Sequence, residues 1–211
     1  MSDLEEKERI IEIAEQRFLQ HGTSKVTLDE IASDLRMSKK TIYKFFPSKE
    51  DLLKTIVHAI MARLRARVEG IVESDKPFAQ KAPELLAVLG RQIGMISKQF
   101  MLDLQRFAPA LWKEMDEFRR ERILTNVRRM FSQAQKEGVF RKDLDIELFI
   151  LVFLSSVQGI VNPHNLTQQS FSGEEALAGI FKIIFEGAVT DEARKDLHLF
   201  DKPTANSSFA R

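Results

Sequence analysis

Five basic side chains and no acidic one lie between residues 35 and 49: Arg36, Lys39, Lys40, Lys44 and Lys49. At helical spacing Lys40, Tyr43 and Lys44 share one face, and the apolar side chains fall on the opposite face: Ile42, Phe45 and Phe46. A short helix that is anchored by apolar side chains and exposes Lys, Thr and Tyr suits insertion into the major groove of DNA. Lysines attract phosphates, while hydroxyl groups and a tyrosine can reach base edges or backbone oxygens.

Two short helices and a turn are predicted to position this face. The first has an apolar stripe at positions i, i+3, i+4 and i+7: Leu28, Ile31, Ala32 and Leu35. Thr27 stands just before the stripe with Glu30 three residues later, which is the pattern of a capping box. Arg36-Met37-Ser38 interrupts the stripe, and Ser38 is a good N-cap for the second helix. The pattern predicts a helix-turn-helix. An amphipathic hairpin with merely solvated lysines is the alternative, which the cap, the turn and the one-sided charge together disfavour.

Residues 27–53 resemble the DNA-binding signature of TetR-type bacterial transcriptional regulators. The resemblance lies in a Thr-led helix, Ile31-Ala32, Ser38, Thr41-Ile42-Tyr43, Phe45-Phe46, Ser48-Lys49-Glu50 and Leu52-Leu53, and it covers about a quarter of the chain, from about Ile10. Two positions depart from the usual pattern. Arg36 stands where the turn commonly carries Gly, and a Cβ there disfavours a left-handed turn residue. Lys40 stands where the recognition helix often carries a small residue, and it adds charge at the groove.

Nine residues are the candidates for contacts with double-stranded DNA. Most would reach the groove and its phosphates from the second helix, while Thr27 and Lys49 would hold the DNA backbone from neighbouring helix starts, where free amides favour anions. The set is Thr27, Arg36, Ser38, Lys39, Lys40, Thr41, Tyr43, Lys44 and Lys49.

The composition argues against several other classes of protein. The net charge is +1 and there is no cysteine, so disulfides and thiolate sites are excluded and a reducing, cytoplasmic location is expected. The acidic start lacks the layout of a signal peptide, and the most apolar run, residues 148–161, is short for a bilayer span. Four scattered histidines, no glycine-rich phosphate loop and no nucleophile motif predict no metal, no cofactor and no enzyme activity. We expect a soluble protein with no membrane partner.

Periodicity predicts an all-α chain of about nine helices. A first helix over residues 3–21 would brace the helix-turn-helix, and a long connecting helix would run over 48–73 before a break at 74–77. Further helices are expected over 82–107 and 116–137, with a break at Pro109 and a short piece over 110–115 between them; the last two run over 148–161 and onward from the Ser172–Glu175 capping box. The predicted domains are 1–54 for DNA binding, 55–192 for ligand binding and dimerisation, and a tail over 193–211.

The last two long helices suggest a homodimer. The penultimate helix is apolar nearly all round, which implies either an interface or complete burial within a monomer. The resemblance implies that the helices around 146–162 and 173–189 pack against those of a second subunit. A two-fold dimer would place two recognition helices about 34–36 Å apart, so the expected operator is pseudo-palindromic.

The resemblance also implies an effector pocket in the helical C-terminal part of the chain. Aromatic and thioether side chains gather around Pro109, and polar groups from the penultimate helix could join them; the candidates are Phe100, Leu104, Phe107, Trp112, Met115, Phe118, Gln158 and Asn162. These side chains could equally fill a core. The predicted function is a ligand-responsive homodimeric repressor. The alternatives are a ligand-independent DNA-binding protein of the same fold acting through protein partners, or a helical small-molecule binder or enzyme that has lost DNA binding.

Overall fold

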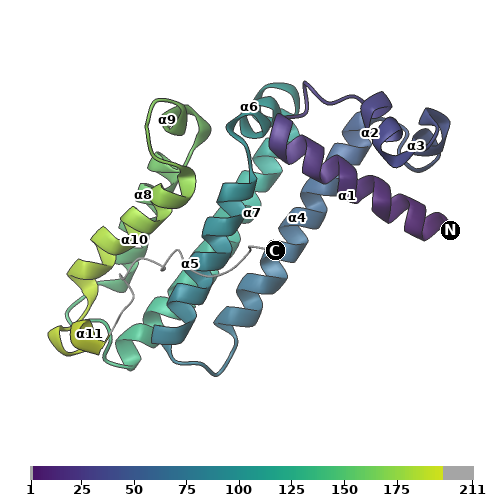
Figure 1. Ribbon diagram of the computed structural model, residues 1–211. Coiled ribbons are helices and arrows are strands. Elements are labelled where there is room, and N and C mark those ends of the chain that lie inside the picture. Colours follow the sequence, from purple (N-terminus) through teal and green to yellow (C-terminus); the bar gives the residue numbers. More distant parts are fainter. Residues whose placement is uncertain (1, 197–211) are drawn as a thin grey trace, which may run out of the picture.

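The computed structural model describes residues 2–196; Met1 and residues 197–211, which include most of the expected tail, lie outside the described residues (Figure 1). The described part contains eleven helices, two more than expected, and a single isolated bridge between Phe140 and Val189. The all-α class is confirmed. The helices are α1 (Asp3–His21), α2 (Leu28–Leu35), α3 (Lys39–Phe45), α4 (Lys49–Val72), α5 (Phe78–Met95), α6 (Lys98–Phe107), α7 (Pro109–Lys136), α8 (Ile146–Ile160), α9 (Pro163–Thr167), α10 (Gly173–Ala188) and α11 (Asp191–Asp196).

Side-chain caps begin three of these helices where the sequence predicts them. Complete capping boxes start α2 from Thr27 and α10 from Ser172, and Ser38 accepts the N–H of Thr41 at the start of α3. Each cap satisfies backbone donors that would otherwise lack partners at a helix start. The helix-turn-helix is therefore formed by local signals, since both of its helices carry their own start.

Arg36 corrects one expectation about the turn. It adopts the left-handed conformation with φ 53° and ψ 38° in spite of its Cβ. The N–H of Met37 donates to the Ala32 carbonyl at 2.9 Å, and the N–H of Arg36 donates to the Ser33 carbonyl at 3.0 Å. These bonds close the end of α2 and offset a left-handed conformation that costs about 1–2 kcal/mol.

Two predicted helix boundaries are wrong. The helix expected over residues 82–107 is two helices, because the chain breaks at Ile96 and Ser97 caps α6 by accepting the N–H of Phe100 at 3.2 Å. The pieces expected over 110–115 and 116–137 are one helix, α7, which begins at Pro109. Proline is well tolerated at the first helical position, since its missing N–H would have no partner there.

The described residues form two apolar cores, and α4 contributes to both. The N-terminal core joins α1, α2, α3 and the first half of α4, and it also takes Phe100, Leu104 and Leu111 from α6 and α7. The second core joins α5, α7, α8 and α10, with Val72 from the end of α4. Because α6 packs into the first core, the DNA-binding unit is braced from beyond the boundary predicted at residue 54. That division stays a prediction.

Phenylalanine rings fill much of the second core. All six pairs among Phe131, Phe140, Phe149 and Phe185 have ring centroids between 4.9 and 5.7 Å apart, with tilted or edge-to-face planes. Such pairs add about 0.5–1.5 kcal/mol beyond the area they bury. The α7, α8 and α10 helices are thus held in one packed unit.

Candidate nucleic-acid interface

The second helix of the helix-turn-helix, α3, presents the face that the sequence predicts. Ile42 and Phe46 are buried, whereas Lys39, Lys40, Tyr43 and Lys44 are exposed. The pattern places Phe45 on the buried face, but it is only half-buried. The centroid of its ring lies 4.9 Å from the Lys44 Nζ atom. The polar face is therefore free to approach a groove while two apolar side chains hold the helix on the N-terminal core.

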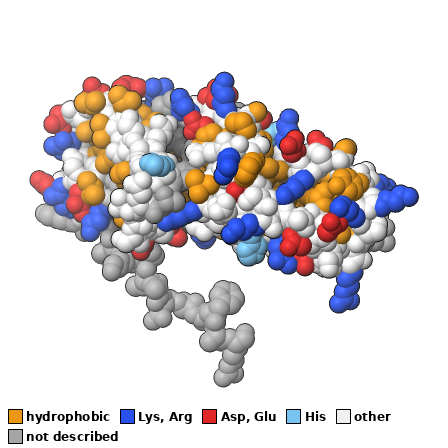
Figure 2. All heavy atoms as spheres, turned by 90° about the horizontal axis from the view of Figure 1, so that it is seen from above, with side chains coloured by type: hydrophobic (Ala, Val, Ile, Leu, Met, Phe, Trp, Pro, Cys, Tyr) orange, Lys and Arg blue, Asp and Glu red, His pale blue; other side chains and the backbone are white. Residues whose placement is uncertain are grey.

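Two of the α3 lysines are paired with carboxylates of this chain. Lys39 Nζ lies 2.9 Å from the Asp29 carboxylate, and hydrogen bonding to this carboxylate raises the pKa of Lys39. Lys44 Nζ lies 2.7 Å from the carboxylate of Asp3. At the end of the molecule formed by α1–α3, Figure 2 shows basic and acidic side chains beside one another. Both lysines are exposed, so a phosphate can replace each carboxylate.

Lys40 and Arg36 differ from these lysines. Both are exposed, and neither forms an ion pair within the part of the chain that the structure describes. Together with Tyr43 they are the exposed side chains of the predicted set that the described contacts restrain least. They are the side chains best placed to meet DNA without first breaking an internal contact.

Thr27 holds its own helix start. Its hydroxyl group accepts the N–H of Glu30 at 3.2 Å and donates to the Glu30 carboxylate at 2.9 Å. Hydrogen bonds from the Thr27 backbone and side chain lower the pKa of Glu30. The Glu30 carboxylate thus occupies the positive end of α2, where a phosphate would otherwise bind most readily.

Lys49 points into the protein. Its ammonium group donates to the carbonyl of Thr23 and lies 5.8 Å from the ring centroid of Phe18. Burial lowers the pKa of Lys49. This geometry gives Lys49 a role in joining the start of α4 to the turn after α1, and it does not favour the expected phosphate contact.

The eight predicted effector residues are spread over several surroundings. Phe100 and Leu104 are buried in the N-terminal core, and Trp112 and Met115 pack partly buried against it. Phe118 is half-buried on α7, Gln158 is exposed on α8, and Asn162 caps α9 by accepting the N–H of Asn165. Four of these side chains share the N-terminal core, and the effector pocket stays a prediction.

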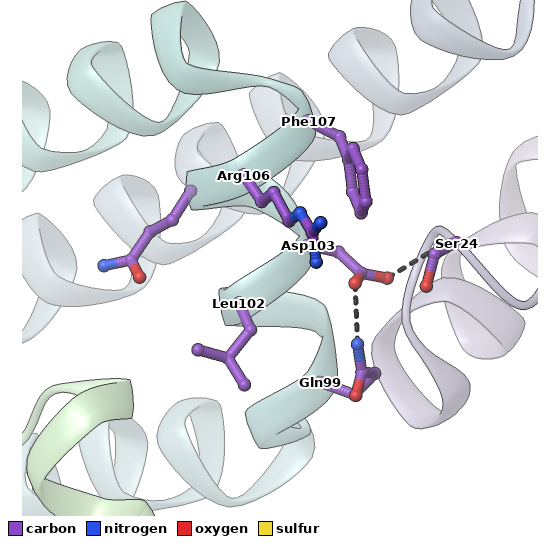
Figure 3. Close-up of a pocket in the computed structure, with 7 residues that line it drawn as sticks. Ser24, Gln99, Leu102, Asp103, Arg106 and Phe107 are labelled. Atoms are coloured by element: carbon purple, nitrogen blue, oxygen red, sulfur yellow. Dashed lines mark hydrogen bonds between the residues drawn. The ribbon is translucent and has the colours of Figure 1, made fainter.

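Phe107, the eighth residue of that set, lines a cavity of about 470 Å³ at the surface between α6 and the α1–α2 turn (Figure 3). Phe107 is 56% exposed, and the Arg106 guanidinium group lies 5.2 Å from its ring. The cavity also exposes part of a polar contact around Asp103, which the sequence reasoning missed. The signal was present: Asp103 lies three residues after Phe100 and beside Leu104, on the apolar stripe of α6.

A second exposed surface lies on the last long helices. Four large apolar side chains of α8 and one of α10 are exposed, although other residues of the same helices are buried in the core: Leu148, Leu151, Val152, Ile160 and Ile183. Leu151 is 62% and Ile183 is 74% exposed. Neither helix is therefore wholly buried within one chain. No helix in the described residues is both long and apolar enough to cross a membrane.

Comparison with known proteins decides the class of the chain. Residues 10–56 match the family described as bacterial regulatory proteins, tetR family. The protein of Bacillus subtilis named "Uncharacterized HTH-type transcriptional regulator YvaF" is 22% identical over 167 residues, which cover 79% of this chain and 87% of that protein. The protein of Escherichia coli K12 named "Probable acrEF/envCD operon repressor" is 25% identical over 166 residues, covering 75% of each chain. These matches support a TetR/AcrR-type regulator. Regulators of this family act on transcription and are not enzymes.

The fold of this regulator is shared with solved structures. A protein from Saccharomonospora viridis, solved in complex with choline, superposes with a TM-score of 0.70 at 20% identity and covers 89% of the regulator and 99% of that protein. The matched segment, residues 10–56, ends within α4 and contains the whole helix-turn-helix. The α3 face described above therefore belongs to the part of the regulator with the most direct family match.

Proposed function

We propose that the regulator is a homodimeric repressor that binds a pseudo-palindromic operator through α3 and releases it when a small molecule binds. The observation that carries the proposal is the exposed face of α3, with Lys40 and Tyr43 open and Ile42 and Phe46 buried beneath. A helix anchored in this way can enter the major groove without unfolding its own core.

The DNA contacts divide by the surroundings of each side chain. Lys40, Tyr43 and Arg36 reach DNA directly, and Ser38 and Thr41 lie at the N-terminal end of α3, which enters the groove first. Lys39 and Lys44 reach phosphates after leaving their carboxylates, and Thr27 lies at the start of α2. Lys49 acts indirectly, by holding the start of α4.

The exposed apolar side chains of α8 and α10 form the proposed dimer surface. Burying large apolar side chains contributes about 1.5–3 kcal/mol for each, so a second copy gains much by covering Leu148, Leu151 and Ile183. A two-fold dimer then presents two α3 helices to half-sites about 34–36 Å apart. TetR-family regulators form dimers and bind operators, which agrees with this arrangement.

Two relatives support negative, ligand-dependent regulation. The E. coli protein is named as an operon repressor, and the S. viridis protein was solved with choline bound. Release of DNA by a ligand requires that the ligand bind the two conformations of the regulator unequally.

The test is binding selection from fragmented genomic DNA with the purified regulator, with Tyr43→Ala as its matched variant. The proposal expects a short pseudo-palindrome that is enriched by the wild type and lost with Tyr43→Ala. A regulator that is folded and dimeric but enriches no sequence above the variant, even after refolding to strip bound small molecules, would contradict it.

One observation favours a second candidate, a DNA-binding protein of the same fold that acts through protein partners without a ligand. Phenylalanine rings fill much of the second core, and four of the predicted effector side chains pack in or against the N-terminal core. Thermal unfolding with a small-molecule panel distinguishes the two, because a ligand of the native state raises Tm by mass action. A ligand that raises Tm and releases the operator supports the ligand-responsive repressor.

A further inference from the structure

Asp103 is a buried carboxylate at the contact between α6 and the turn that joins α1 to α2. It is 2% exposed. One carboxylate oxygen accepts the N–H of Ser24 at 2.6 Å and lies 3.5 Å from the Thr23 hydroxyl group, and the other accepts the side-chain amide of Gln99 at 2.7 Å (Figure 3). Burial raises the pKa of Asp103, but the hydrogen bonds from Ser24, Gln99 and Thr23 outweigh it and hold the pKa below its ordinary value. The carboxylate therefore stays charged and bonded at neutral pH.

The same turn is also held from α4, and the end of α1 that precedes it is held from α6. Lys49, the first residue of α4, donates to the carbonyl of Thr23. The N–H of Ser97 donates to the carbonyl of Leu19 at 2.9 Å, which joins the start of α6 to the end of α1. The turn thus lies between α6 and the first turn of α4.

Gly22 shows how closely α6 approaches. Its φ is 84°, and a Cβ at this position would lie 2.6 Å from the Asp103 carboxylate and 2.6 Å from Gln99 Cγ. Non-bonded atoms do not approach so closely without displacement. The close packing is independent of the hydrogen bonds, and both features fix α6 to the same few residues.

We infer that Asp103 is a positioning residue for DNA recognition, which fixes residues 22–25 against α6 and so sets the orientation of α2 and α3. The inference rests on the proposed DNA-binding function. The turn leads into α2, and Lys49 ties it to α4, which directly follows α3. Both ends of the helix-turn-helix therefore depend on a turn that α6 holds, although Asp103 lies 79 residues further along the chain than Ser24.

The test compares Asp103→Ala and Asp103→Asn with Gln105→Ala, an exposed position on the same helix. Affinity is measured for the operator recovered with the wild type and for a single half-site. Asp103→Ala removes the acceptor of both Ser24 and Gln99. It is expected to weaken operator binding by at least about tenfold, the effect of losing a single hydrogen bond to a charged group, because the two α3 helices no longer keep a fixed spacing. Binding to the half-site changes less. Asp103→Asn keeps one acceptor oxygen, so its operator affinity should lie between those of Asp103→Ala and the wild type. Gln105→Ala should bind the operator with the affinity of the wild type.

Amide hydrogen exchange measures the same contact without DNA. In Asp103→Ala, the amides of Ser24 and of the first turn of α4 should lose protection against exchange. Gly22→Ala displaces α6 by its added Cβ, so it should show the same faster exchange and the same loss of operator affinity. The inference would be overturned if Asp103→Ala lost equal affinity for the operator and for the half-site, or if the exchange rate of the Ser24 amide were unchanged in that variant. If the wild type itself enriches no DNA, the proposed function fails, and unchanged exchange in Asp103→Ala then separately overturns the role of Asp103 in fixing the turn.

Discussion

The ammonium group of Lys44 on the recognition helix lies 2.7 Å from the carboxylate of Asp3 in the first turn of α1. Lys39 and Asp29 form a second pair of this kind at 2.9 Å. In the DNA-free regulator two carboxylates thus occupy cations that the proposed operator complex needs, and each must leave before a phosphate can bind.

Removing these carboxylates is expected to strengthen DNA binding. Asp3→Asn and Asp29→Asn should each raise affinity by about two- to fivefold, the range of exposed ion pairs, with the larger gains at low salt. Fluorescence anisotropy with a labelled operator measures the change. Asp34→Asn is the control, because it removes the same charge from α2 but frees Arg17 and no lysine of α3. Equal gains in all three variants would show an effect of net charge alone.

Lys40 and Lys49 should respond differently to substitution by alanine. Lys40→Ala removes an exposed cation, so affinity should fall and the slope of log affinity against log salt should decrease by about one. Lys49→Ala removes the bond to the Thr23 carbonyl, so Tm should fall while the salt slope stays unchanged. Titrations at several salt concentrations, beside thermal unfolding, separate the two. A decreased slope for Lys49→Ala would restore the direct phosphate contact expected from the sequence.

Arg36 offers a test of backbone strain in the turn. Arg36→Gly relieves the cost of a Cβ at φ 53° and should raise the free energy of unfolding by about 0.5–1 kcal/mol, whereas Arg36→Ala keeps that cost and should not. Denaturant unfolding gives both values. Both variants remove the same charge, so any loss of operator affinity that they share measures the contribution of the guanidinium group.

The exposed apolar surface of α8 and α10 predicts a change of assembly. Leu151→Asp and Ile183→Asp should each give a monomer in analytical ultracentrifugation, because a carboxylate in an apolar interface has no partner to offset its desolvation. Met95→Asp alters another exposed apolar side chain, at the end of α5, and should leave the dimer intact. If Leu151→Asp and Ile183→Asp both remained dimeric, this surface could not be the interface.

The lowered pKa of Asp103 predicts how its contribution to stability depends on pH. A carboxyl group whose pKa is lower in the folded state stabilises the protein above its unfolded pKa of about 3.9, and this stabilisation is lost as pH falls through the folded value. The Tm difference between the wild type and Asp103→Asn should therefore be constant near neutral pH and shrink below about pH 4. Thermal unfolding of both proteins from neutral to acidic pH measures it, and a difference that grows on acidification would contradict the assignment.

The helix-turn-helix was predictable because its signals are local. Thr27 and Ser38 cap their own helices, and Leu28, Ile31 and Ile42 mark the buried faces, so no knowledge of distant residues was needed. The break between α5 and α6 was not predictable in this way. The apolar stripe continues in register from Ile93 to Phe100 without proline, and it hides the break that the Ser97 cap and the hydrogen bond from Ser97 to Leu19 fix in the structure.

The surroundings of the site residues depended on contacts across the sequence. Their exposure on α3 follows from helical periodicity, which is why Lys40 and Tyr43 were identified. Lys44 forms its ion pair with Asp3, which is 41 residues away in the sequence, and Lys49 donates to the carbonyl of Thr23, which is 26 residues away. Spacing along one helix carries no information about such partners, so the phosphate contact expected of Lys49 could not be tested before the fold was known.

In the proposed release of DNA, the α4 helix would act as a lever arm, because it contributes to both cores. Its 24 residues span about 36 Å, and its far end is held where the buried Lys81 donates to the carbonyl of Val72 and to Gln133. A tilt of about 5° about that fulcrum moves the end beside α3 by about 3 Å, close to the rise of one base pair. A rearrangement too small to disturb the phenylalanine core would thus be amplified into a shift of one step along the groove.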